Sequence, residues 1–136
     1  MKKLLEKTDF VSHYWVEAKN LLIQEWHNIE SKMAAEDYKE GMQSFMALAE
    51  QYQAKQVLVD TFQLRFLVSP ELQAWVDQEI SAKASKIIDR IAFLLPSDLF
   101  EQVSIQQTME EDAGRTYKAV EYFDEYETAE NWLMGT

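Results

Sequence analysis

The residues of this chain whose types and spacing could do chemistry gather around one loop. They follow the apolar run at residues 57–59 or begin the next helix, and they are Asp60, Thr61, Ser69 and Glu71. A carboxylate beside a hydroxyl at the carboxyl end of a strand lies where open α/β sheets bind their ligands. A serine that begins a helix can accept a hydrogen bond from a free backbone amide. Residues 60–71 are therefore the candidate binding surface.

The loop between these polar residues is unusually apolar. Its apolar members, on either side of Arg65, are Phe62, Leu64, Phe66, Leu67 and Val68. A segment of this kind fills a core, lines an apolar pocket or makes a subunit contact, and the last of these would give a homodimer. We take Phe62, Arg65 and Phe66 as candidate contact residues for a ligand or a partner protein.

Ser69 and Asp60 each have a plainer interpretation than a binding role. Ser69 followed by Pro70 is typical of a helix start, where the hydroxyl stabilises the helix by about 1 kcal/mol. As a site of phosphorylation, Ser69 would hold its phosphate near the positive end of the helix dipole, but Glu71 would repel that phosphate within the same turn. Asp60 can instead accept hydrogen bonds from amides of the loop that follows it. The plainer interpretation is favoured for both residues.

Catalytic and metal chemistry find little support in the sequence. His13 and His27 flank a predicted hairpin, but no further ligands stand at a recognisable spacing, so we interpret both as surface imidazoles. The adjacent acids Glu110, Glu111 and Asp112 indicate a solvated helix end. The chain has no cysteine and only three glycines, which excludes thiol chemistry and argues against a glycine-rich phosphate loop. We expect no enzyme activity, no cofactor and no metal.

Alternating strands and helices must position these residues. Two β-rich runs at residues 13–17 and 21–26 predict a hairpin in which Asn20 takes a left-handed turn conformation. Further strands are predicted at residues 56–59, 90–95 and 117–123. Helices are predicted over residues 34–52, from Ser69 to about Ala84, from Ser97 or Asp98 to Gly114, and from Asp124, with Glu127 completing a capping box.

This order predicts one α/β domain over residues 1–136. Strands that are joined through helices should lie parallel, so we expect a mostly parallel central sheet of about five strands, an N-terminal antiparallel hairpin and about four helices. The run at residues 56–59 is apolar on both faces, which predicts a central strand covered by helices on both sides.

Charge and hydropathy limit the partners that the protein can have. The net charge is -11, and residues 98–136 carry ten acidic side chains against two basic ones. This charge disfavours nucleic acid and anionic membrane surfaces, and a solvated acidic face is its simplest explanation. The opening MKKLLEK lacks the apolar run of a signal peptide, and no window approaches the roughly 20 apolar residues of a membrane span. We therefore expect a cytoplasmic protein without stable membrane insertion.

Four stretches of the chain together resemble the STAS and SpoIIAA-like group of small bacterial domains. They are QVLVD followed by Thr61, VSPELQAWV, AFLLPSDLF and VEYFDEYETAENWL, and the resemblance spans roughly residues 14–133. It implies a non-enzymatic α/β domain that regulates or binds another protein. Relatives include anti-sigma factor antagonists, which are switched by phosphorylation of a serine at the start of the helix after a central strand. Ser69 lies nearest to that serine, although this chain lacks the Asp-Ser-Ser-Gly run of the phosphorylated relatives.

The same group is also likened to lipid carriers of the CRAL-TRIO type. This implies an alternative function, the carriage or sensing of a small nonpolar molecule. The residues that would hold it are aromatic, namely Phe62, Phe66, Trp75 and Phe93. Aromatic residues at such positions equally serve as ordinary core packing.

Overall fold

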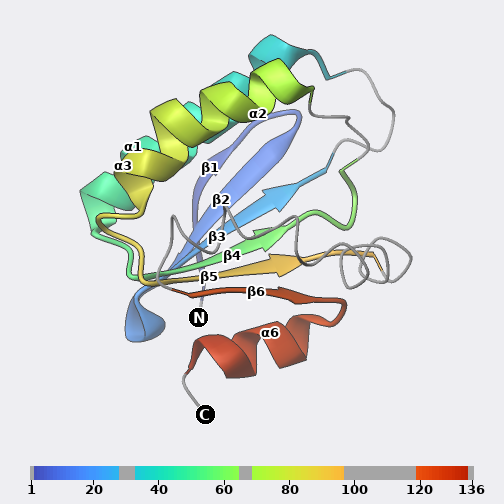
Figure 1. Cartoon of the computed structure of the whole chain (residues 1–136). Helices are drawn as coiled ribbons and strands as arrows, with labels where there is room; N and C mark the ends of the chain where they lie inside the picture. The colour runs from blue at the N-terminus through green and yellow to red at the C-terminus, as the bar shows by residue number, and fades with distance from the viewer. Residues whose placement is uncertain (1, 28–32, 65–68, 97–118, 135–136) are drawn as a thin grey trace.

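The computed structural model describes residues 2–27, 33–64, 69–96 and 119–134. At their centre lies a six-stranded sheet whose strands are neighbours in chain order, as Figure 1 shows. The strands are β1 (Lys3–Lys7), β2 (Val11–Val16), β3 (Leu21–Trp26), β4 (Gln56–Asp60), β5 (Arg90–Leu94) and β6 (Ala119–Phe123). The first three strands form an antiparallel meander, and β3 to β6 run parallel to one another.

Two tight connections hold the meander together. Between β1 and β2, the hydroxyl of Thr8 accepts hydrogen bonds from the amides of Phe10 and Val11 at 3.2 and 3.1 Å. Between β2 and β3, the 3-10 turn η1 (Glu17–Lys19) ends at Asn20, whose φ of 52° lies in the left-handed region. Asparagine tolerates this conformation better than most residues, and the predicted left-handed turn is confirmed.

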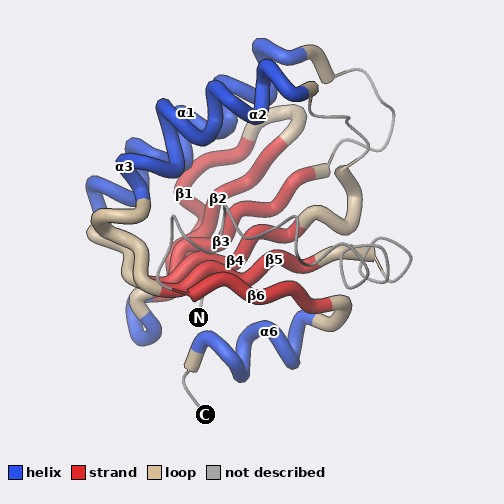
Figure 2. The backbone as a smooth tube through the Cα atoms, viewed as in Figure 1, coloured by secondary structure: helices blue, strands red, loops and turns tan. Residues whose placement is uncertain are grey.

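Helices cover both faces of the sheet (Figures 1 and 2). One face carries α1 (Ala35–Tyr52) and, beside it, the run of α2 (Pro70–Val76), the π-helical segment η2 (Asp77–Ser81) and α3 (Ala82–Ala84). The opposite face carries α6 (Tyr126–Leu133), which packs mainly against β5 and β6. The sheet therefore separates two apolar cores.

Strand β4 contributes to both cores, as its sequence predicts. Val57 and Val59 belong to the core beneath α1, whereas Leu58 packs with Ala129 and Leu133 of α6. All three valine and leucine side chains of the strand are buried. Its position between two parallel neighbours and two helical layers explains why polar residues are missing from this run.

Several sequence-based predictions need correction. The sheet has a sixth strand, β1, in a segment where the sequence predicts no strand, so the predicted hairpin is part of a meander. Helix α6 begins after Glu125 without a side-chain cap, one residue later than the predicted cap at Asp124. The predicted helix from Asp98 to Gly114, with the acids at residues 110–112, lies outside the described residues.

Candidate functional site

The predicted surface begins at the carboxyl end of β4, and its first two polar side chains are engaged within the fold. Asp60 accepts a hydrogen bond from the amide of Phe62 at 3.0 Å through Oδ1. Thr61 donates its hydroxyl to the carbonyl oxygen of Leu94 at 2.8 Å, next to a backbone bond to the same oxygen. Asp60 thus orders the start of the loop, and Thr61 ties that loop to the end of β5.

Ser69 and Glu71 begin α2 as the sequence predicts. The hydroxyl oxygen of Ser69 accepts a hydrogen bond from the amide of Leu72 at 3.1 Å, and Pro70 occupies the first helical position. Ser69 is therefore a helix cap in this structure. Glu71 is exposed in the first turn. Arg65 and Phe66, the remaining candidates of this surface, lie outside the described residues.

Asp60 also lies beside a second carboxylate on the neighbouring strand. It is the register partner of Glu25 on β3. Burial raises the pKa of the Asp60 carboxyl above its ordinary value, and the nearby Glu25 carboxylate adds to this rise, while the amide of Phe62 and the ammonium of Lys2 oppose it. Burial likewise raises the pKa of the Tyr126 hydroxyl, with further contributions from Glu130, Asp60 and Glu25. The negative charge at this end of the sheet is only partly compensated.

The aromatic residues proposed to hold an apolar ligand are divided between the two cores. Phe62 packs against the core under α6, whereas Trp75 and Phe93 pack against the core under α1, on the other side of the sheet. Phe93 also stacks on Tyr122 with ring centroids 5.4 Å apart. These three side chains therefore do not line one common cavity, and each has the contacts of a packing residue.

His13 is not a surface imidazole, and this prediction was wrong. The side chain has 0% relative exposure and lies in the core between β2 and α1. Alternation along β2 explains its position, because Val11 and Trp15 on either side of it point into the same core. His27 is half-buried and its Nε2 lies 3.1 Å from the hydroxyl of Ser12. The two imidazoles therefore have separate partners.

His13 is the middle member of a series of hydrogen-bonded polar side chains that crosses the meander. We call this series the polar network. Its Nδ1 lies 3.2 Å from Oε1 of Glu6 on β1, and its Nε2 lies 3.2 Å from Nε2 of Gln24 on β3. Oε1 of Gln24 accepts the indole N–H of Trp26 at 3.0 Å. At the other end, the hydroxyl of Ser44 on α1 donates to Oε2 of Glu6 at 3.4 Å. Buried polar groups are retained when every member finds a partner, as here.

Trp26 lies at the buried end of the polar network and is closely packed. Its ring stacks on Tyr38 with centroids 5.0 Å apart. A methyl group in place of the α-hydrogen of Gly41 would lie 2.6 Å from the ring carbon Cη2 of Trp26. Gly41 therefore allows α1 to approach the indole closely, while Tyr38 of the same helix stacks on its ring.

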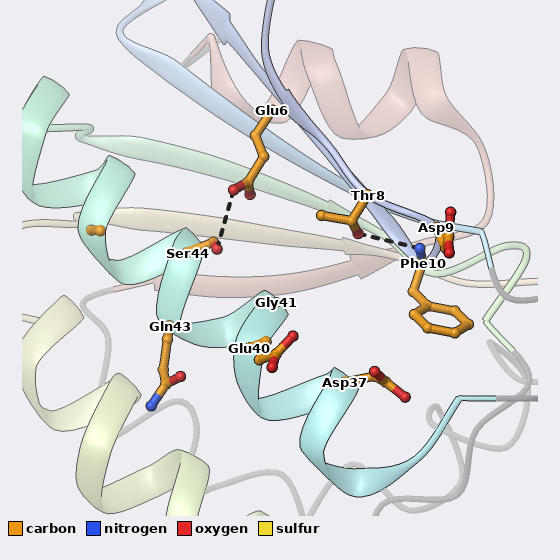
Figure 3. A pocket seen from close by; sticks show the side chains of 10 residues that line it. Glu6, Thr8, Asp9, Phe10, Asp37, Glu40, Gly41, Gln43 and Ser44 are labelled. Atoms are coloured by element: carbon orange, nitrogen blue, oxygen red, sulfur yellow. Dashed lines mark hydrogen bonds between the residues drawn. The ribbon is translucent and has the colours of Figure 1, made fainter.

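The exposed end of the polar network, at Glu6, opens into a groove between α1 and the β1–β2 turn, which Figure 3 shows. The groove has a volume of about 600 Å³. Its walls are Glu6, Thr8, Asp9 and Phe10 on the meander side, and Asp37, Glu40, Gly41, Gln43, Ser44 and Ala47 on α1. Four of these ten described residues are acidic and none is basic. The side chain of Glu6 is 37% exposed, so it connects the polar network to the groove.

The groove carboxylates differ in how strongly the fold uses them. Asp37 accepts a hydrogen bond from the amide of Ala34 at 2.8 Å and caps the start of α1. Glu6 is held by His13 and Ser44. Asp9 and Glu40 are exposed, and within the described residues no lysine or arginine forms an ion pair with any of the four acids. The groove therefore offers uncompensated negative charge to whatever enters it.

Sequence reasoning missed this groove, although one signal was present. Val11, His13 and Trp15 alternate with the period of a strand, which places His13 on the apolar face. The acids that line the groove carry no such pattern, since they come from two segments far apart in the chain. Within the described residues, no three histidine, aspartate or glutamate side chains are grouped closely enough to hold a metal ion.

Comparison with known proteins leaves the site to be judged on its own geometry. The chain matches no protein-family model, no curated protein and no solved structure. Among the described helices, none combines the length and apolar character needed to cross a bilayer. Because a fold alone does not determine function, the groove and the polar network behind it are the features from which a function can be inferred.

Proposed function

We propose that this chain is a non-enzymatic interaction module of the STAS and SpoIIAA-like type that acts in the cytoplasm and receives a basic segment of a partner protein in its acidic groove. The observation that carries this proposal is the absence of lysine and arginine among the described residues lining the groove, four of which are acidic. The resemblance in the sequence supports a binding role rather than a catalytic one. The net charge of -11 favours a basic partner over an acidic one.

The groove is a better candidate than the surface at residues 60–71 because its polar groups are more available. Asp60, Thr61 and Ser69 each direct a polar atom to a backbone partner in the same chain. In the groove, Asp9 and Glu40 are exposed and carry their charge into open space. A guanidinium or ammonium group that enters the groove can therefore form ion pairs without first breaking contacts of the fold.

Fluorescence anisotropy with a labelled decapeptide of alternating arginine and glycine tests this proposal. We expect saturable binding that weakens with salt, since exposed ion pairs are screened. Removing two groove charges in the double variant Asp9→Asn with Glu40→Gln should weaken binding by about three- to ten-fold, the sum of two exposed ion pairs.

The matched control removes the same amount of charge elsewhere. Glu71 and Glu127 are exposed in the first turns of α2 and α6, outside the residues that line the groove. The double variant Glu71→Gln with Glu127→Gln should therefore bind the peptide nearly as well as the wild type. Equal losses in the two double variants would show that the peptide responds only to net charge, and the groove would lose its assigned role.

A further inference from the structure

The hydrogen bonds of the polar network behind the groove have a fixed direction, because Trp26 at the buried end can only donate. The indole of Trp26 has a single N–H and no acceptor, so the atom of Gln24 that faces it must be the amide oxygen. The amide nitrogen of Gln24 is then turned toward Nε2 of His13 at 3.2 Å, with Sδ of Met42 at 3.9 Å as a second, weak acceptor. Both N–H groups and the oxygen of this buried amide are used.

This orientation determines where His13 carries its proton. Because Gln24 donates to Nε2 of His13, that nitrogen has to accept and therefore has no hydrogen. The neutral ring then has its hydrogen on Nδ1, which donates to Oε1 of Glu6. Ser44 donates to the other oxygen of the same carboxylate. Three donors in succession thus lead from the indole to Glu6, which accepts the last of them as an anion.

A second proton on His13 conflicts with this arrangement. It would place an N–H on Nε2, directly facing the N–H group of Gln24. Turning the amide of Gln24 over would relieve that conflict, but it would bring the amide nitrogen against the indole N–H of Trp26. Trp26 is 2% exposed and stacks on Tyr38, so moving the indole away would require the core around it to repack. Burial lowers the pKa of His13 below its ordinary value, while the charge and hydrogen bond of Glu6 oppose that shift.

The groups that face His13 from each neighbouring element are few. On β1 there is Glu6, on β3 there is the neutral Gln24, and on α1 the ring of Phe45 lies with its centroid 6.4 Å away. The other groove acids are Asp9, Asp37 and Glu40, and within the described residues no hydrogen bond or ion pair joins any of them to His13. Burial raises the pKa of Tyr38 to about 12, so its hydroxyl keeps its proton throughout the range in which histidine titrates. Glu6 is therefore the only charged group in direct contact with His13 among the described residues.

We infer that His13 is a positioning residue for the groove, held neutral with its proton on Nδ1, and that it makes the binding of a cationic side chain at Glu6 depend on pH. With a neutral imidazole behind it, the Glu6 carboxylate presents its full negative charge to the groove. When His13 takes up a second proton, the imidazolium cancels that charge at a separation of 3.2 Å. A guanidinium or ammonium group in the groove then loses one ion-pair partner. This inference rests on the proposed function for the identity of the ligand, but the proton state of His13 can be measured without it.

The first test is nitrogen NMR of the histidine side chains, recorded between pH 5 and 8 on the full chain. At pH 7.5 we expect Nδ1 of His13 to carry the proton and Nε2 to carry none. In Gln24→Glu, the new carboxylate accepts from both Trp26 and Nε2 of His13, so the second proton should bind at a higher pH than in the wild type. Wild-type spectra that show a proton on Nε2 of His13 at pH 7.5 would overturn the inference, whether or not the variant folds.

The second test measures binding of the same arginine-containing decapeptide at constant ionic strength, at pH 7.5 and at a lower pH where the NMR titration shows His13 with its second proton. Wild type should bind about two- to five-fold more weakly at the lower pH, the contribution of one exposed ion pair. His27→Gln controls for the other imidazole and should show the same decrease, whereas His13→Gln should bind equally at the two pH values. A His13→Gln protein that keeps the wild-type decrease would overturn the inference while leaving the proposed function intact.

The two proposals fail in different ways. A peptide that does not bind at either pH would remove the proposed function and the ligand of the inference together, and the NMR spectra would still decide how His13 is protonated. Where the peptide binds, reciprocity requires that a saturating concentration of it lowers the pH at which His13 takes up its second proton. An unchanged titration of His13 in the complex would overturn the coupling.

Discussion

Trp26 donates its indole N–H to Oε1 of Gln24 across 3.0 Å, and this contact sets the direction of every hydrogen bond that follows it toward the groove. Both side chains are almost completely buried, at 2% and 1% relative exposure. A buried amide can be turned over at little cost when its neighbours both donate and accept, but an indole only donates. The orientation of Gln24, and through it the proton of His13, therefore depends on a residue that itself never titrates.

Replacing Trp26 by phenylalanine should lower the free energy of unfolding by about 1–3 kcal/mol or more. The substitution removes the donor to Oε1 of Gln24, and a buried acceptor left without a partner costs roughly that amount, to which the smaller ring adds a packing loss. Urea unfolding followed by circular dichroism measures the change. Trp132 provides a control, because its indole N–H forms no hydrogen bond within the described residues, so Trp132→Phe should cost less. Equal losses would mean that packing alone explains the effect.

Replacing Gly41 by alanine should destabilise the protein, against the usual preference of helices. Alanine in the middle of a helix is normally about 1 kcal/mol more favourable than glycine. Here the added methyl group would lie 2.6 Å from a ring carbon of Trp26, and overpacking of this kind costs about 1–3 kcal/mol. The same urea titration checks the sign. Gln43→Ala on the exposed side of α1 serves as the control and should be neutral or slightly stabilising. A more stable Gly41→Ala protein would show that the ring of Trp26 can move.

Much of the fold could be predicted because its strands are apolar runs bounded by turn residues. The strands at residues 21–26, 56–60 and 90–94 agree with the predicted ones to within one residue, and α1 begins one residue after the predicted start. The missed strand β1 lacks such a pattern. Its sequence KLLEK has charged residues at both ends and a register shift between Leu4 and Glu6, as suits an edge strand that must not pair further.

The candidate site could be predicted less well, for a physical reason. The cap at Ser69 and the loop bond at Asp60 depend on residues two or three positions away, so the sequence alone indicates them. The groove depends on α1 lying beside the β1–β2 turn, and neither β1 nor that packing is visible in local patterns. Residue type alone predicts an exposed His13, whereas its alternation with Val11 and Trp15 along one strand face predicts the buried position that it has.

Removing the charge of Asp60 should stabilise the protein at neutral pH. Asp60 and Glu25 are register partners on adjacent strands, and like charges in such positions repel each other by about 0.2–1 kcal/mol. Asp60→Asn keeps an oxygen for the amide of Phe62 but removes the repulsion. Because the pKa of Asp60 is raised in the folded state, ionisation of this carboxyl costs stability as pH rises from its ordinary value of 3.8 through the raised one, so the gain from Asn should develop over that range and be complete above it.

A double-mutant cycle shows whether this gain comes from the pair. Glu25→Gln should give a similar gain to Asp60→Asn at pH 7, and the two together should give less than the sum, since either one alone removes the repulsion. Urea midpoints at pH 7 measure all four proteins. Strictly additive gains would mean that the two carboxylates do not interact, and a loss on Asp60→Asn would mean that its charge is needed.

Replacing Ser69 by alanine should lower stability by about 1 kcal/mol and leave peptide binding unchanged. The substitution removes the acceptor for the amide of Leu72, which forms the only hydrogen bond of the Ser69 hydroxyl among the described residues. Ser69→Asp preserves an acceptor and should keep most of the stability, because aspartate caps helices as well as serine does. A Ser69→Ala protein that unfolds normally but binds the peptide differently would return residues 60–71 to the role that the sequence suggested for them.

The stability of the folded state should fall in mild acid because of His13. Its pKa is lowered on folding, first by burial, so below the ordinary value of 6.5 the unfolded chain binds a proton that the folded one does not. The free energy of unfolding therefore falls as pH decreases below about 6.5, by at most about 1.4 kcal/mol per pH unit for one proton. Urea unfolding at pH 7.5, 6.5 and 5.5 should show this loss in the wild type and in His27→Gln. The loss should be smaller in His13→Gln, because the glutamine side chain does not titrate. If His13→Gln lost as much stability as the wild type between pH 6.5 and 5.5, the acid sensitivity would belong to groups other than His13.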